Sequence, residues 1–150
     1  MIARSWVLDA SVAVKAFLPD EELADEASEF LDAFESGLIR TVFIPEHFFA
    51  ECANVFWKST VRYRLSPELA IQKLEGLSEL SFSVVTSIDN RIEALRLAIE
   101  TGISVYDALY VSLARSLRLP LISADAKLIR AVAPRFRDIV WLADWESASH

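Results

Sequence analysis

The chain has 150 residues, about the length of one folded domain, and a formal net charge of −7. Hydrophobic residues make up 53% of it, which excludes intrinsic disorder and is enough for a sizeable core. The acidic surplus excludes a nonspecific coat for nucleic acid or for an anionic membrane, but it is compatible with a carboxylate-rich metal site. We therefore expect one domain covering residues 1–150.

Cysteine usage and charge spacing predict a cytoplasmic protein that makes no membrane contact. The single cysteine, Cys52, can form neither an intrachain disulfide nor a thiolate zinc site. The longest uncharged run, residues 80–88, is far shorter than the ~20 residues of a membrane-spanning helix. Arg4 and Asp9 interrupt the N-terminus before the apolar core of a signal peptide can form.

Short apolar strands alternate with helices along the chain. Strands are predicted at residues 5–8, 41–44, 83–86, 120–123 and 139–142. Helices are predicted at residues 12–18, 21–36, 46–63, 66–79, 89–101, 104–117 and 126–133. This alternation predicts an α/β fold with a central, mostly parallel sheet of about five strands, covered on both faces by helices.

Acidic residues stand where the strands and helices of such a fold meet. Asp9 follows the first strand, Asp125 follows the fourth, and Asp107 lies in the first turn of a helix. The carboxyl ends of parallel strands share one edge of the sheet, where ligands bind. Because each of these residues also begins a helix, helix capping is the favoured explanation for any one of them alone.

Glu51 does not fit the capping explanation, because it lies in the middle of an apolar helix. A charged side chain on a buried face costs several kcal/mol unless it is paired or bound to a metal. Asn54, one turn further on, could orient the carboxylate through a hydrogen bond. The alternative is that Glu51 belongs to a narrow exposed stripe with His47, Asn54 and Lys58, which recur at helical spacing.

Four carboxylates at one edge of a sheet would repel one another unless cations neutralised them. Carboxylate and water ligands favour Mg²⁺ or Mn²⁺ over zinc. Two such ions can activate a water molecule and stabilise the leaving oxygen of a phosphodiester. The acids therefore indicate a site for hard divalent cations, which is a kind of site that can hydrolyse a phosphodiester.

Four segments together resemble one known family. They are VLDASV at residues 7–12, ECANV at 51–55, YDALYVSLA at 106–114 and LISADAKL at 121–128. In this order and at this spacing they resemble the PIN domain, and more narrowly the VapC-type toxins of toxin–antitoxin pairs. The resemblance covers nearly the whole chain and implies a three-layer α/β/α PIN-like fold.

The resemblance implies a metal-dependent endoribonuclease that uses water as the nucleophile. Asp9 and Asp107 match the positions that hold the main Mg²⁺ or Mn²⁺ ion. Glu51 matches a metal ligand or a water-orienting acid, and Asp125 matches a more peripheral acid. Polar neighbours of these acids are expected at Ser11, Asn54 and Ser123. The last of these stands where the family commonly has Thr, so the hydroxyl is kept and the methyl group is lost.

The resemblance also implies a VapB-like antitoxin and a homodimer as partners. Four aromatic residues crowd one helix, at positions 48, 49, 56 and 57, and two tryptophans lie near the end of the chain. Most should be core, and the surplus could serve a dimer seam or an antitoxin helix. Lys15 and Lys127 lie close in sequence to Asp9 and Asp125, and we expect them to contact RNA. The alternative is that the basic residues only complement helix C-termini.

Three other functions fit parts of the pattern. A PIN-type nuclease of RNA processing or decay would keep every residue named above. A phosphotransfer or phosphatase domain would use Asp9 as nucleophile and Lys127 as phosphate clamp, but it lacks the second acid that such sites carry. A non-catalytic binding module would keep the fold without turnover. Under each of these hypotheses His47 is a helix-start residue and Cys52 belongs to the core.

Overall fold

The computed structural model describes residues 3–146, which contain five β-strands. The strands are β1 (Ser5–Leu8), β2 (Thr41–Pro45), β3 (Ser83–Val85), β4 (Leu121–Ser123) and β5 (Ile139–Trp141). All four pairings between neighbouring strands are parallel. The predicted positions of the strands are confirmed.

Seven α-helices connect the strands. They are α1 (Ala10–Ala16), α2 (Ala24–Glu35), α3 (Phe48–Val61), α4 (Pro67–Ser78), α5 (Ile88–Thr101), α6 (Val105–Leu117) and α7 (Ala126–Val132). A short 3₁₀ helix, η1 (Leu142–Asp144), follows β5. None of the helices described within residues 3–146 has by itself the length and apolar character of a membrane span.

The strand order β3-β2-β1-β4-β5 puts β1 at the centre of the sheet. The chain moves outward from β1 to β3, then crosses back to β4 on the other side of β1. The strand order therefore reverses between β1 and β4, and ligands of open α/β sheets bind beyond the carboxyl ends of the strands at such a point. Asp9 and Asp125 follow these two strands.

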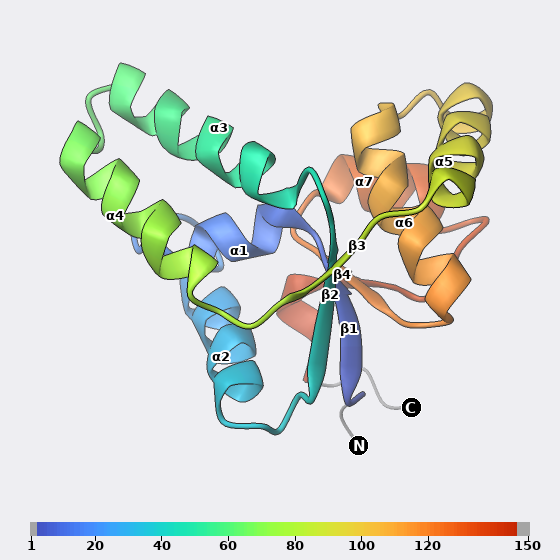
Figure 1. Cartoon of the computed structure of the whole chain (residues 1–150), viewed down its shortest axis with the longest axis horizontal. Coiled ribbons are helices and arrows are strands. Elements are labelled where there is room, and N and C mark those ends of the chain that lie inside the picture. The colour runs from blue at the N-terminus through green and yellow to red at the C-terminus, as the bar shows by residue number, and fades with distance from the viewer. Residues whose placement is uncertain (1–2, 147–150) are drawn as a thin grey trace.

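The helices form two layers, one on each face of the sheet (Figure 1). Helices α1 to α4 lie on one face, and α5 to α7 lie on the other. Helices α3 and α4 form an antiparallel pair that extends away from the sheet. This arrangement is the predicted three-layer α/β/α fold with a parallel sheet of five strands.

The core forms around strand β1 and the inner faces of the helices. Trp6 is fully buried and packs its ring edge-to-face against Phe30, which packs in the same way against Trp145. In α3 the buried residues Phe48, Cys52 and Phe56 recur every four positions. Cys52 is a buried core residue, and its burial raises the pKa of the thiol. The thiol is therefore a poor nucleophile.

Two backbone positions set the ends of helices. Helix α2 begins at Ala24, three residues later than predicted, because Leu23 adopts the left-handed conformation at φ 65°. Gly102 closes α5 in the same region at φ 80°, where a side chain would be strained. That turn sends the chain directly into α6, which carries Asp107.

Candidate metal centre

A pocket lies beyond the carboxyl ends of the strands and brings the four predicted acids together. Its acidic residues are Asp9, Glu51, Asp107 and Asp125, which come from the loop after β1, from α3, from α6 and from the loop after β4. We call it the acidic pocket. The polar residues Ser11, His47, Asn54, Lys58 and Tyr106 also line it.

Asp9 precedes α1 but does not cap it. Its side chain makes no capping bond, and Oδ2 instead accepts hydrogen bonds from Ser11 Oγ at 2.6 Å and Ser123 Oγ at 2.8 Å. Burial raises the pKa of Asp9 to about 7; the two hydroxyls oppose this rise, and the nearby carboxylates of Asp107 and Glu51 add to it. The capping explanation is therefore wrong for this residue.

The two serines also tie the end of β1 to the segment after β4. Ser11 Oγ accepts from the backbone N–H of Ala124 at 2.9 Å, and Ser123 Oγ accepts from that of Asp125 at 3.0 Å. Each hydroxyl thus donates to Asp9 and accepts from the loop that leads to Asp125. Through these bonds the two strand-end acids are held in one hydrogen-bonded unit.

Glu51 is oriented by Tyr110 and His47, two residues to which the sequence assigned no role at the acids. Tyr110 donates its hydroxyl to Oε1 of Glu51 at 2.6 Å, and Nε2 of His47 lies 3.1 Å from the same oxygen. Partial burial acts to raise the pKa of Glu51, but the bonds from His47 and Tyr110 outweigh it and lower the pKa. Asn54 lines the pocket but makes none of the hydrogen bonds found in the described part of the chain, so the predicted bond to Glu51 is absent there.

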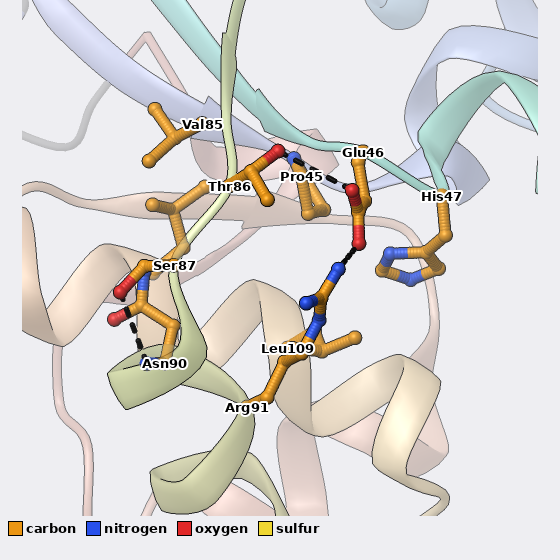
Figure 2. A pocket seen from close by; sticks show the side chains of 10 residues that line it. Pro45, Glu46, His47, Val85, Thr86, Ser87, Asn90, Arg91 and Leu109 are labelled. Atoms are coloured by element: carbon orange, nitrogen blue, oxygen red, sulfur yellow. Dashed lines mark hydrogen bonds and ion pairs between the residues drawn. The ribbon is translucent and has the colours of Figure 1, made fainter.

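His47 immediately precedes α3, as predicted for a helix-start residue, but it makes no capping bond. Nε2 also lies 2.9 Å from the backbone carbonyl of Tyr106, and the ring packs against that of Tyr110. His47 lines a second, smaller pocket as well (Figure 2). There Glu46 forms an ion pair with Arg91 and accepts a hydrogen bond from Thr86, which joins the start of α3 to α5.

Asp107 and Asp125 differ in what their carboxylates bind. Ser104 caps α6 by accepting from the backbone N–H of Asp107, so the Asp107 carboxylate is not needed as a cap. Burial and the charges of Glu51 and Asp125 raise the pKa of Asp107. Oδ1 of Asp125 caps α7 by accepting from the N–H groups of Lys127 and Leu128. The capping explanation thus holds for Asp125.

The predicted RNA contacts of Lys15 and Lys127 stay predictions, and the structure shows where the basic residues lie relative to the acidic pocket. Lys58 lines the acidic pocket, whereas Lys15 and Lys127 are not among its lining residues. The ammonium group of Lys15 donates to the backbone carbonyl of Glu22 at 2.9 Å. The sequence contained a signal for Lys58, because this residue belongs to the stripe with His47 and Glu51.

The sequence also contained a signal for Tyr110, because it follows Asp107 by three residues and so shares its helix face.

The donor set fits a hard divalent cation. In residues 3–146 no three Asp, Glu, His or Cys side chains are placed to hold an ion on their own. Mg²⁺ generally keeps several waters and takes only one or two protein carboxylates, so four carboxylates around an open pocket suit it. Burial, with a smaller effect of the carboxylates of Asp107 and Glu51, raises the pKa of Asp9, and a bound cation would favour the ionised form of this carboxyl group.

Comparison with known proteins gives consistent similarities. The PIN domain matches residues 6–133. Ribonuclease VapC3 of Pyrobaculum aerophilum is 30% identical over 124 residues, which cover 81% of this chain and 90% of that protein. The crystal structure of PAE2754 from Pyrobaculum aerophilum has a TM-score of 0.69 at 25% identity and covers 97% of this chain and 99% of its own. A toxin–antitoxin complex from Klebsiella pneumoniae contains the same fold, with a TM-score of 0.59 at 18% identity and coverage of 89% and 94%.

Proposed function

Since the chain belongs to the PIN domain family, we propose that it is an endoribonuclease that depends on Mg²⁺ or Mn²⁺. The observation that carries this proposal is the convergence of four carboxylates from four separate segments on one pocket. The name of the relative, Ribonuclease VapC3, supports RNA as the substrate.

In this proposal Asp9 and Asp107 hold the main cation, while Glu51 and Asp125 complete its surroundings. The cation, when bound, would lower the pKa of a coordinated water and offset the charge of the phosphodiester. Ser11 and Ser123 hold Asp9 through a single oxygen, Oδ2, and so fix the orientation of the carboxylate. Asp125 contributes through Oδ2, because its Oδ1 is engaged in capping α7.

In this proposal, Glu51 orients the attacking water. Its lowered pKa keeps it ionised at neutral pH, and an ionised carboxylate accepts hydrogen bonds from water. Tyr110 and His47 both bind Oε1 and thereby direct the other oxygen, Oε2, to this role. Lys58, at the rim of the pocket, would contact a phosphate of the RNA, as would Lys127 at the start of α7.

We further propose that the chain is the toxin of a toxin–antitoxin pair, acts in the cytoplasm and forms a homodimer. The VapC name of its relative supports a VapB-like antitoxin as partner. Trp57 remains exposed beside an apolar groove between α3 and α4, which suits an apolar antitoxin helix. Growth arrest on induction, rescued by a small neighbouring gene, distinguishes a toxin from a nuclease of RNA processing.

RNA cleavage by the purified chain tests the central proposal. A mixed structured RNA is incubated with Mn²⁺, with Mg²⁺ and with chelator, alongside the Asp9→Asn and Asp107→Asn variants. Cleavage that needs the metal and is lost in both variants is the expected result. The matched control is Asp32→Asn, an exposed acid on α2, which should cleave like the wild type. Absence of metal binding in calorimetry would favour a non-catalytic binding module, whereas metal binding without cleavage would point to a narrow RNA target or a retained inhibitor.

A further inference from the structure

One aromatic side chain is left exposed at the acidic pocket. Tyr106 lines the pocket, immediately precedes Asp107 in α6 and is 63% exposed. Tyr110, one turn further along the same helix, is fully buried and orients Glu51. Within residues 3–146 the other exposed aromatic side chains are at positions 57 and 63, and neither of them lines the acidic pocket. Tyr106 is therefore the open aromatic ring beside the proposed cation site.

The ring of Tyr106 is supported by the protein on one side. Nε2 of His47 lies 3.1 Å from Oε1 of Glu51 and 2.9 Å from the backbone carbonyl of Tyr106, and because both oxygens are acceptors, Nε2 carries a proton. The imidazole ring lies against the Tyr106 ring, with 5.7 Å between the centroids and a tilt of 45°. A tyrosine side chain has only two χ angles to fix, so a supported ring loses little conformational entropy when it binds a ligand.

The charges of the acidic pocket make phosphate contacts a limited source of affinity for RNA. The lining contains four carboxylates and a single ammonium group, that of Lys58. Since every phosphodiester of RNA is negative, the strand needs contacts besides a bound cation and one lysine. Stacking of a base on an aromatic ring supplies affinity that does not depend on a positive charge.

Stacking on a protein side chain also selects the conformation of the RNA. A base inside a duplex is covered by its neighbours, whereas an unpaired base in a loop can turn one face to an aromatic ring. Tyr106 adjoins Asp107, to which we assign the main cation. A base that stacks on Tyr106 would thus belong to a nucleotide close to the phosphodiester at that cation.

We propose that Tyr106 is a platform on which an unpaired base stacks, next to the phosphodiester that is cleaved. This inference rests on the proposed nuclease function and deepens it by naming a side chain that selects the RNA. The platform uses the face of the ring, so it does not need the hydroxyl group, which makes none of the hydrogen bonds found in the described part of the chain. Because every base has a face that can stack, Tyr106 selects an unpaired nucleotide and not one particular base.

RNA binding, measured by fluorescence anisotropy, tests the platform separately from cleavage. The probe is a labelled single-stranded RNA of randomised sequence, with Ca²⁺ in place of Mg²⁺ and a gel to confirm that the RNA stays intact. Tyr106→Ala should raise the dissociation constant about 5- to 150-fold, the loss that alanine causes at stacking residues. Tyr106→Phe keeps the ring and should bind within about twofold of the wild type.

A second tyrosine provides the matched control. Tyr63 is 97% exposed and lies outside the acidic pocket, so Tyr63→Ala removes the same side chain and should bind RNA like the wild type. Circular dichroism checks that each variant is folded, which is expected because both side chains are exposed.

Salt and base pairing identify the kind of contact. The factor between the dissociation constants of Tyr106→Ala and the wild type should be the same at low and high salt, whereas Lys58→Ala should reduce the salt dependence itself. When the probe is annealed to its complement, Tyr106→Ala should change the dissociation constant by less than about twofold, because paired bases offer no free face.

Three results would overturn the platform: an unchanged dissociation constant in Tyr106→Ala, an equal loss in Tyr106→Phe, or a wild type that binds the duplex more tightly than the single strand. Cleavage measured on the same samples reports on the nuclease. RNA that is bound through Tyr106 but is not cut with any metal would refute the nuclease and support the platform. Cleavage by Tyr106→Ala at the kcat/KM of the wild type would refute the platform and support the nuclease.

Discussion

The carboxylate of Asp9 is buried, and its two hydroxyl partners bind the same oxygen. This arrangement orients the group precisely enough for a ligand but does not compensate its charge in the absence of a cation. The pKa of Asp9 is raised because burial disfavours its charged form more strongly than the two hydroxyl groups stabilise it. If Asp9 binds a cation as proposed, its burial favours binding at the expense of the stability of the metal-free chain.

Asp9→Asn should stabilise the metal-free protein at neutral pH. The pKa of Asp9 lies near 3.8 in the unfolded chain and about 7 in the fold, so its contribution to stability is full below pH 4 and is lost as the pH rises to 7. The loss is up to about 4 kcal/mol. Urea unfolding in chelator at pH 4.5 and pH 7.5 should show a smaller decrease in the unfolding free energy for Asp9→Asn than for the wild type. Equal decreases in the two proteins would contradict the assignment, and Asp32→Asn should match the wild type.

Tyr110→Phe should weaken cleavage without removing any carboxylate. The hydroxyl of Tyr110 donates to Glu51 Oε1, so its loss frees the carboxylate to rotate and lets its pKa rise. Removing a residue that orients such an acid generally costs 10–100-fold, roughly, in activity or metal affinity. The acid limb of the pH profile should also move to higher pH. Tyr106→Phe removes a hydroxyl from the same pocket and is the control, because that hydroxyl has no bond to Glu51 in the described structure.

At the scale of elements, helices α6 and α7 both begin at the acidic pocket but use their acids differently. In α6, Ser104 supplies the cap and leaves the Asp107 carboxylate available. In α7, Asp125 is itself the cap and so has only one oxygen available. This difference gives a structural reason for the more peripheral role assigned to Asp125.

Ser104→Ala should therefore lower both stability and cleavage. Loss of the capping bond to the backbone N–H of Asp107 costs about 1 kcal/mol. The substitution also removes the interaction of the Ser104 hydroxyl with the Asp107 side chain, which lowers the pKa of Asp107. Ser66→Ala removes an equivalent cap from α4, which lies outside the acidic pocket. The control should lose similar stability in chemical denaturation but keep its rate of cleavage. Equal cleavage by the two variants would show that Asp107 does not depend on Ser104.

At the scale of the whole molecule, the acidic pocket joins segments that lie far apart in the sequence. A cation bound there would hold the loops after β1 and β4 and the two helical layers together. Binding to the folded state alone stabilises a protein in proportion to the logarithm of ligand concentration. A bound metal ion should thus raise the free energy of unfolding of the whole domain, in addition to its role in RNA cleavage.

Mn²⁺ or Mg²⁺ at about one hundred times its dissociation constant should stabilise the fold by about 2.7 kcal/mol. For a domain of this size that is a rise in Tm of very roughly 5–10 °C, which differential scanning calorimetry measures directly. Chelator should reverse the rise, and Asp9→Asn should abolish it. An unchanged Tm in the wild type, or the same rise in the variant, would count against a cation at Asp9.

The local sequence was sufficient to predict the order and type of the elements, the parallel sheet and the set of four acids. Hydrophobic period, Pro and Gly positions and helix caps are encoded within short windows, so boundaries such as those of α4 and α6 follow from them. Leu23 is an exception, because no local signal marks its left-handed conformation. The resemblance to PIN domains likewise depended only on residue types and their order.

The contacts between distant segments could be settled only by the tertiary structure. Asp9, Asp107 and Asp125 looked alike in sequence, and the fold separates them by burial and by what each carboxylate binds. The partners of Glu51 and the placement of Lys58 rather than Lys15 at the pocket also depend on how helices pack across the sheet. Burial, pKa and long-range hydrogen bonds are properties of side chains brought together in space, and no local pattern in one sequence encodes them.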